Sequence, residues 1–280
     1  MEGKEIIVGN TDLREFEYSG SNMARSLEVD DKGEPIVIEE IDTYLKSLKK
    51  SNYIFEEKSR ESCNPISASI VSEKIIPHVM ICKLIVIDFD GDYSVGTGFF
   101  ISPRCLITSG HNVYSHHRTG KGWATKIIAL PCDDDNDRHF GYSISEEFRS
   151  VSGFVDDDDK SFDYGAVIFP TSDLYRNFRK QFNYGVLTEN DNEITCCGYK
   201  DAELYRGKQS LVEGPYNIFN DYFIKYSFDT DEGNSGSPLY IKDGQNYKVV
   251  GVHRGGSSCE KDCVRVREQV IKNWNIWTNL

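Results

Sequence analysis

From Ile75 onward the sequence is a succession of short β-rich runs separated by Gly, Asp, Asn and Ser, with no helical pattern between them. The runs are VMICKLIVIDF, GTGFFI, CLIT, KIIAL, DYGAVIF, EITCCGY, YFIKYSF, PLYI and YKVVGVH. Short strands at this spacing predict an antiparallel barrel or sandwich. The last two runs are joined by KDGQN, in which Asp243-Gly244 is a strong signal for a hairpin turn.

The two ends of the chain differ from this β-rich part. The first sixty or so residues are charged and mixed, with one helical pattern at about residues 38 to 50. The chain closes with VREQVIKNWNIW, where Val266, Val270, Trp274 and Trp277 share one helical face. We therefore predict an N-terminal extension over residues 1–65, a pro-segment or a regulatory segment, followed by a β-domain over residues 66–280 that ends in a helix.

The net charge and the apolar runs of the sequence indicate which partners and which compartment to expect. A formal net charge of -13 over 280 residues argues against binding to nucleic acid or to an anionic membrane surface. The N-terminus shows no secretory pattern, and no apolar run approaches the length of about 18 residues that spans a bilayer. We expect a cytoplasmic protein, or alternatively one released by a non-classical route.

Eight cysteines occur, and in the absence of an export signal we expect reduced, buried thiols rather than a disulfide framework. Cys259 and Cys263 in SCEKDC are also compatible with a short loop closure or with half of a zinc site, although no second pair with ligand spacing accompanies them. We expect no metal and no cofactor.

Three polar residues stand where a hydrolase would place its catalytic groups. Ser235 lies in the turn-forming stretch TDEGNSGSPLY, directly before a strand, and His111 follows an apolar strand in LITSGHNVY. Asp163 opens the apolar run in SFDYGAVIF. Each residue alone is compatible with an ordinary turn or cap. The chain order His, Asp, Ser is the order of the catalytic triad on paired β-barrels.

The sequence resembles chymotrypsin-fold serine peptidases and, within them, the glutamyl endopeptidase (V8-like) family. The resemblance is carried by TSGH at 108–111, DYGA at 163–166, DTDEGNSGSP at 229–238 and GVHRGG at 251–256. It implies a double antiparallel β-barrel and a serine endopeptidase acting on proteins or peptides. In this family His111 would act as the base, Asp163 would orient it, and the amides of Gly233 and Ser235 would form the oxyanion hole.

The resemblance also implies a substrate-binding pocket made by Asp229, Thr230 and His253. Asp229 occupies the place of the acid that binds Lys or Arg in trypsin-like enzymes, whereas His253 aligns with the histidine that contacts a carboxylate in the acid-cutting family. We favour cleavage after Glu or Asp, with a basic preference as the alternative. Asn234 stands where digestive relatives carry an aspartate that receives a new α-amino terminus, so the oxyanion turn needs another means of organisation.

Near the N-terminus, Glu5-Ile6-Ile7-Val8-Gly9 resembles the mature start of glutamyl endopeptidases, whose freed α-amino group helps to hold the acidic side chain of the substrate. An ordinary surface strand explains the stretch equally well. The acidic run VDDDDK before Asp163 is expected to be a solvated loop.

Two other functions remain open at this point. The first is a protease fold with an inert site that binds a partner. The second is an esterase, which the chain order and the absence of a G-x-S-x-G turn between a strand and a helix disfavour.

Overall fold

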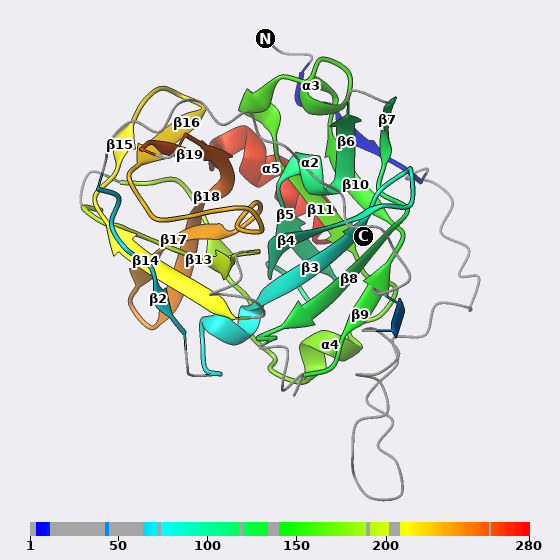
Figure 1. The fold of residues 1–280 in the computed structure, drawn as a ribbon, viewed down its shortest axis with the longest axis horizontal. Coiled ribbons are helices and arrows are strands. Elements are labelled where there is room, and N and C mark those ends of the chain that lie inside the picture. The colour runs from blue at the N-terminus through cyan, green and yellow to red at the C-terminus, as the bar shows by residue number, and fades with distance from the viewer. Residues whose placement is uncertain are drawn as a thin grey trace, which may run out of the picture.

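The computed structural model describes residues 4–11, 43–44, 64–71, 74–117, 120–133, 140–188, 191–201, 208–257 and 259–280. Two large, mainly antiparallel sheets lie side by side, and each curls on itself (Figure 1). The predicted double β-barrel is thereby confirmed. The helical pattern predicted at residues 38 to 50 lies outside the described residues except for 43–44.

The first sheet has eight strands in the order β1-β10-β11-β5-β4-β3-β8-β9. In chain order their bounds are β1 Ile7–Gly9, β3 Ile81–Ile87, β4 Tyr93–Phe100, β5 Cys105–Thr108, β8 Lys126–Pro131, β9 Ser143–Ser145, β10 Phe148–Val151 and β11 Gly165–Ile168. The edge strand β1 comes from the predicted N-terminal extension, and its Ile7 lies opposite Val151 of β10. Part of the extension therefore completes this sheet.

The second sheet follows the order β15-β16-β19-β18-β17-β13-β14-β2, and β12 pairs in parallel with β18. Its strands are β2 Ser69–Ile70, β12 Asn183–Tyr184, β13 Ile194–Tyr199, β14 Gln209–Gly214, β15 Asn217–Ile218, β16 Phe223–Tyr226, β17 Pro238–Asp243, β18 Asn246–Gly256 and β19 Lys261–Arg265. Asp243 lies opposite Asn246, so Gly244 and Gln245 form the predicted hairpin turn, and Gly244 has a φ of 61°.

The remaining elements are short, apart from the last helix. A two-stranded sheet pairs β6 Tyr114–His117 with β7 Gly120–Trp123. The other elements are η1 His78–Met80, α2 Gly110–Val113, α3 Ser152–Val155, η2 Lys160–Phe162, α4 Asp173–Arg176 and α5 Glu268–Trp277. None of the helices in the described part of the chain is long and apolar enough to cross a membrane.

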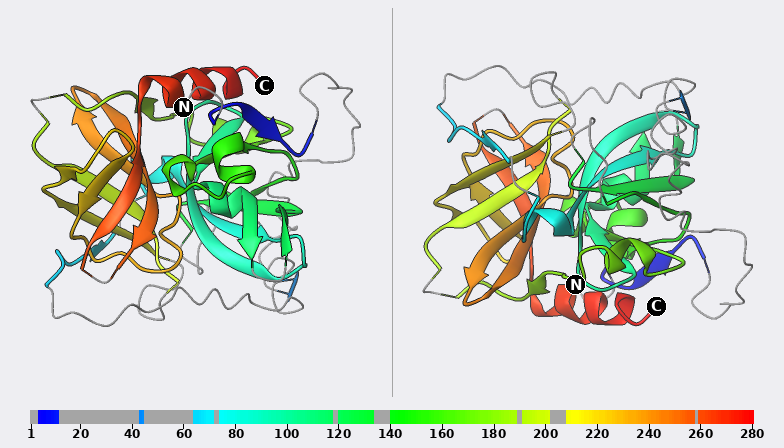
Figure 2. Two further views of the ribbon diagram at one scale, coloured as in Figure 1. Left: turned by 90° about the horizontal axis from the view of Figure 1, so that it is seen from above. Right: turned by 90° about the horizontal axis from the view of Figure 1, so that it is seen from below.

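Helix α5 runs along one side of the pair of sheets (Figure 2). The predicted apolar face is confirmed, because Val270, Trp274 and Trp277 are buried. Trp274 packs edge-on against Phe99 of β4 and Tyr184 of β12. The helix thus contributes to the core between the two sheets, and this core fixes how they sit relative to each other.

Candidate active site

The imidazole of His111 and the carboxylate of Asp163 are paired in the structure. His111 lies in the one-turn helix α2 directly after β5, and Asp163 lies between η2 and β11. His111 Nδ1 is 2.8 Å from Asp163 Oδ2, and the backbone N–H of His111 donates to Asp163 Oδ1 over 2.9 Å. Two bonds to one carboxylate hold both the position and the rotation of the ring.

Asp163 is almost completely buried, and it is nevertheless kept ionised. Burial alone would raise the pKa of its carboxyl group. The charge and hydrogen bonds of His111, together with the charge of Arg254, outweigh burial and lower this pKa below its usual value. Gly110 is needed for the close approach, since a Cβ there would lie 3.0 Å from Asp163 Oδ1 and 2.7 Å from the Phe154 ring.

The loop that carries Ser235 is held in shape by two glycines with left-handed backbones. Gly233 has a φ of 87° and Gly236 has a φ of 88°. A Cβ on Gly233 would lie 2.7 Å from the carbonyl oxygen of Tyr199, and one on Gly236 would lie 2.1 Å from that of Thr97. Both positions therefore require glycine on steric as well as conformational grounds.

Asn234 organises this loop without an ion pair. Its side chain is buried, and Oδ1 accepts a hydrogen bond of 3.1 Å from the N–H of Asp231. The N–H of Asn234 in turn donates to the carbonyl oxygen of Asp231 over 3.1 Å, and the N–H of Ser237 donates to that of Asn234 over 2.9 Å. The amide at this position closes a local turn of its own.

The Ser235 loop is also bonded to the first sheet, close to His111. The N–H of Thr97 in β4 donates to the Ser235 carbonyl oxygen over 2.8 Å, and the side-chain amide of Asn112 donates to the same oxygen over 3.0 Å. The hydroxyl of Thr97 donates to the Gly233 carbonyl oxygen over 2.8 Å. Since Asn112 follows His111 in α2, these bonds bring Ser235 to the helix that carries the imidazole.

The hydroxyl of Ser235 and the imidazole of His111 have other partners in this structure. Ser235 Oγ donates to the carbonyl oxygen of Arg254 over 3.4 Å, and His111 Nε2 lies 3.3 Å from Ser109 Oγ. Among the described residues no hydrogen bond joins Ser235 to His111. Both side chains are partly exposed, so a substrate can reach them.

The residues predicted to form the substrate pocket differ in their surroundings. Asp229 Oδ2 forms an ion pair of 2.8 Å with Lys200, whose side chain is only 2% exposed. Lys200 thus neutralises the carboxylate that would attract a basic side chain. Thr230 is buried, and its hydroxyl has no hydrogen-bond partner in the described part of the chain.

His253 lies on β18 and is 2% exposed. Burial, with further contributions from the charges of Lys261, Arg254 and His111, lowers the pKa of His253 to about 3. The ring is therefore neutral at ordinary pH. Its Nδ1 lies 2.5 Å from the hydroxyl of Tyr226. The neighbouring Arg254 is bound by both oxygens of Asp262, at 2.8 Å and 2.6 Å.

The N-terminal stretch lies on the first sheet. The Ile6 carbonyl oxygen accepts a hydrogen bond of 2.9 Å from the N–H of Ser152, while the Ile6 side chain is 61% exposed. Glu5 forms an ion pair with Arg267, and Lys4 pairs with Asp157 and Asp159 of the acidic loop. The acidic loop is therefore a partly exposed turn that also binds the N-terminal stretch through Lys4.

The cysteines mostly behave as predicted. Six of them are free and buried: Cys82, Cys105, Cys132, Cys196, Cys197 and Cys263. Cys259 is the exception, since it is disulfide-bonded. Among the described residues no group of three or more His, Cys, Asp or Glu side chains is placed to hold a metal ion.

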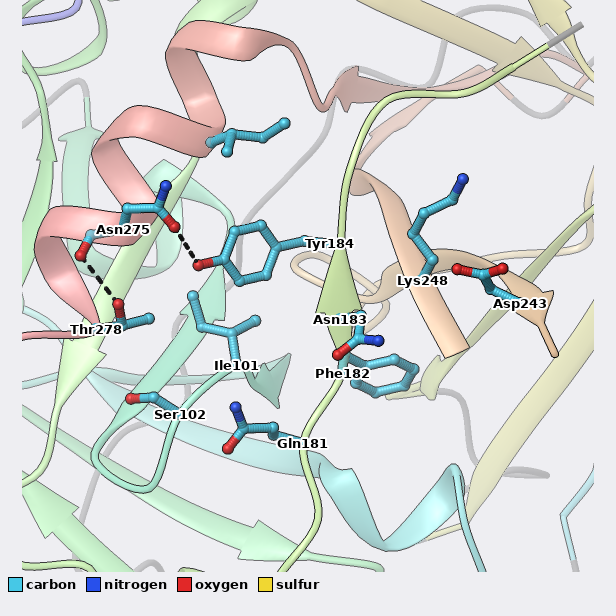
Figure 3. A pocket seen from close by; sticks show the side chains of 11 residues that line it. Ile101, Ser102, Gln181, Phe182, Asn183, Tyr184, Asp243, Lys248, Asn275 and Thr278 are labelled. Carbon is cyan, nitrogen blue, oxygen red and sulfur yellow. Dashed lines mark hydrogen bonds between the residues drawn. The ribbon is translucent and has the colours of Figure 1, made fainter. Parts of the chain in front are cut away.

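A pocket of about 590 Å³ lies between β12, β18 and α5 (Figure 3). At one side of it Tyr184 donates a hydrogen bond of 2.7 Å to Asn275 of α5. None of the residues predicted to act in catalysis or substrate binding lines this pocket.

Comparison with solved structures identifies the architecture. A Glu endopeptidase, solved in complex with MPD, superposes with a TM-score of 0.67 at 20% identity and covers 78% of this chain and 99% of that one. A thermostable serine protease from an extremophilic microorganism gives a TM-score of 0.63 at 14% identity, covering 72% and 98%. The fold is that of the chymotrypsin-like serine proteases. A protease from Arthrobacter nicotinovorans shares this chymotrypsin-like fold, with a TM-score of 0.63 at 15% identity over 74% of this chain and 98% of that one.

Two curated proteins are similar in sequence. The "Extracellular metalloprotease" of Bacillus subtilis is 28% identical over 193 residues, which are 65% of this chain and 58% of that protein. The "Glutamyl endopeptidase" of Bacillus licheniformis is 28% identical over 195 residues, or 65% and 59%. The matched part thus spans less than two thirds of each relative's length. No family model matches the chain. The resemblance to glutamyl endopeptidases drawn from the sequence motifs is confirmed.

Sequence reasoning did not single out Ser109, Asn112, Lys200 or Lys261. Ser109 and Asn112 lie within two residues of His111, and this closeness in the sequence is the signal that points to them. Lys200 ends the apolar run EITCCGYK, and a charged residue at the end of a buried strand was a usable signal. Nothing in the sequence pairs Lys200 with Asp229, because that contact depends on the tertiary fold.

Proposed function

We propose that the chain is a serine endopeptidase that cleaves peptide bonds after acidic residues. The supporting observation is that one short helix links both parts of the chemistry: His111 is paired with buried Asp163, and the adjacent Asn112 is bonded to the backbone of Ser235. His111, Asp163 and Ser235 also follow one another along the chain in the order found in chymotrypsin-like proteases.

In this proposal His111 takes the proton of Ser235 as its oxygen attacks the substrate carbonyl, and an acyl-enzyme forms on Ser235. His111 then hands the proton to the leaving amine, and a water molecule releases the acyl group by the reverse sequence. Asp163 remains ionised throughout, since its pKa is held below the usual value. It fixes the tautomer of His111 and stabilises the imidazolium.

The amides of Gly233 and Ser235 are proposed to bind the oxyanion. In the described part of the chain neither amide donates to a protein acceptor, although the loop around them is otherwise well bonded. Donors fixed in this way act without reorganisation during the reaction.

An acidic preference is proposed from three features of the pocket. Lys200 neutralises Asp229, which removes the attraction for a basic side chain. The buried Thr230 hydroxyl has no hydrogen-bond partner among the described residues, so it is able to donate to the carboxylate of a substrate. The Tyr226 hydroxyl lies 2.5 Å from His253 Nδ1 and 3.2 Å from the Asp262 carbonyl oxygen. In this proposal it donates its hydrogen bond to the nearer His253 Nδ1, so the neutral ring carries its proton on Nε2, where it donates to a carboxylate.

The test is labelling with a fluorophosphonate probe followed by cleavage of a peptide library, mapped by mass spectrometry. We expect labelling of the wild-type chain, none of the Ser235→Ala variant, and cleavage after Glu or Asp. Activity should survive EDTA, which separates this mechanism from the metal chemistry named in one relative. A chain that is not labelled between pH 6 and 9 would be the inert binding module or a latent zymogen instead.

A further inference from the structure

Lys261 is the first residue of β19. It lies directly opposite Tyr226 of β16 in the antiparallel register. Residues opposite each other in such a pair project their side chains to the same face of the sheet. Because Tyr226 is buried with its hydroxyl against His253, the side chain of Lys261 lies on the face of these two residues.

The alternation of side chains between the two faces of β19 also places Lys261 on the face of Tyr226 and His253. Cys263, two residues further on, points to the same face as Lys261 and is completely buried opposite His253 and Ile224. Lys261 stands at the end of this buried row and is partly exposed. Its positive charge acts on His253 and contributes to lowering the pKa of that histidine.

The ammonium group of Lys261 has no carboxylate within ion-pair distance in the part of the chain that the structure describes. Burial lowers its pKa most strongly, the charges of Asp231 and Asp229 oppose this shift, and that of Lys200 adds to it. The lysine is thus a partly desolvated cation beside two acids that it does not touch.

The other positive charges near the pocket are already compensated. Lys200 and Asp229 form an ion pair, and Arg254 is bound by both oxygens of Asp262. His253 is neutral. A carboxylate entering this pocket would therefore meet one uncompensated positive charge, that of Lys261.

We propose that Lys261 is the specificity-determining cation that binds the carboxylate of an acidic substrate side chain, with His253 and Thr230 as hydrogen-bond donors. This inference rests on the proposed endopeptidase function and deepens it. In this proposal Lys261 supplies the positive charge that binds the acidic side chain of the substrate, the role that the family resemblance gives to a freed α-amino group. The intact chain then needs no processing to recognise Glu or Asp.

The experiment compares peptides that differ only in Glu, Gln or Lys before the cleaved bond. Lys261→Met removes the charge and keeps the length of the side chain, while Lys242→Met removes an exposed lysine of β17 as the matched control. We expect Lys261→Met to lower kcat/KM for the Glu peptide by about 10- to 100-fold, the range of a charge-assisted hydrogen bond. Cleavage of the Gln peptide should change by less than about threefold, and Lys261→Arg should retain the preference for Glu.

A Lys261→Met variant that keeps the wild-type ratio of Glu to Gln cleavage overturns the inference and leaves the endopeptidase function standing. A second measurement is independent of catalysis. In the Ser235→Ala background, calorimetric binding of product peptides ending in Glu or Gln should favour Glu, and Lys261→Met should abolish that difference. If the wild-type chain hydrolyses nothing, the proposed function fails. Equal binding of the two product peptides would then reject the role of Lys261 as well.

Discussion

The Nε2 atom of His111 lies 3.3 Å from the hydroxyl oxygen of Ser109. This is the nitrogen that would have to accept the proton of Ser235, whose hydroxyl is 3.4 Å from the Arg254 carbonyl oxygen. The proposed nucleophile and base are thus brought together by the backbone but are each engaged elsewhere. Binding of substrate would have to exchange these two weak contacts for one between Ser235 and His111.

Ser109→Ala removes the competing partner of His111. We expect kcat/KM to stay at the wild-type value or to rise by up to about tenfold, since a neutral hydrogen bond contributes about 0.5–1.5 kcal/mol. Steady-state hydrolysis of a peptide with Glu before the cleaved bond measures this. A fall of tenfold or more would show instead that Ser109 holds His111 in its working position.

His111→Ala and Ser235→Ala should each reduce kcat by several orders of magnitude, and the double variant should be little worse than either single one. Residues that act as one unit give such non-additive losses. The thermal midpoint of Ser235→Ala should remain close to that of the wild type, because this side chain is partly exposed. That of His111→Ala should fall, because the buried Asp163 carboxylate loses its main partner. Additive losses in the double variant would indicate that the two residues do not share a step.

Asp163→Asn should lower kcat by about 10⁴-fold, because an amide favours the wrong tautomer of the histidine. The same substitution tests stability. The pKa of Asp163 is depressed in the folded state, so the ionised carboxylate stabilises the fold above its unfolded pKa of about 3.9 and loses this effect as the pH falls through the folded value. Urea unfolding should show the difference between wild type and variant shrinking from pH 6 to pH 2. A constant difference would mean that the charge of Asp163 contributes nothing to stability.

How far the sequence predicts this molecule depends on the range of the interactions involved. The β-rich runs, the Asp243-Gly244 turn and the apolar face of α5 are local patterns, and all of them were found where they were expected. A strand was one of two interpretations of the stretch that contains β1. Strands such as β10, β14 and β19 were not predicted, because their sequences mix polar and apolar residues and their pairing with neighbouring strands specifies them. The pairing of His111 with Asp163 followed from motif order. The Lys200–Asp229 and His111–Ser109 contacts depend on side-chain placement after folding, which no local pattern encodes.

Lys200→Met leaves the carboxylate of Asp229 uncompensated near the substrate pocket. We expect the ratio of cleavage after Lys to cleavage after Glu to rise by about tenfold or more, since one charged partner of a close pair has been removed. The double variant with Asp229→Asn should return the ratio towards the wild-type value, which controls for any general damage from altering a buried residue. An unchanged ratio in Lys200→Met would place Asp229 outside the reach of the substrate.

The bond between Glu5 and Ile6 should survive incubation of the intact protein, although its sequence suits an acid-specific protease. Three contacts hold the stretch to the folded domain. Glu5 forms an ion pair with Arg267, and its carbonyl oxygen accepts a hydrogen bond of 3.4 Å from Asn273 Nδ2. The carbonyl oxygen of Lys4 accepts a hydrogen bond of 2.6 Å from the N–H of Gly153.

A protease needs its substrate strand free to enter the site, and opening this edge would break all three contacts. Intact-mass spectrometry of the wild-type and Ser235→Ala chains over the same period should therefore show residues 1–5 retained in both. Arg267→Met removes the ion pair of Glu5 and should make the bond more susceptible to added wild-type enzyme. Loss of residues 1–5 from the wild type but not from Ser235→Ala would contradict this prediction and would restore a freed amine at Ile6 as a candidate partner of His253.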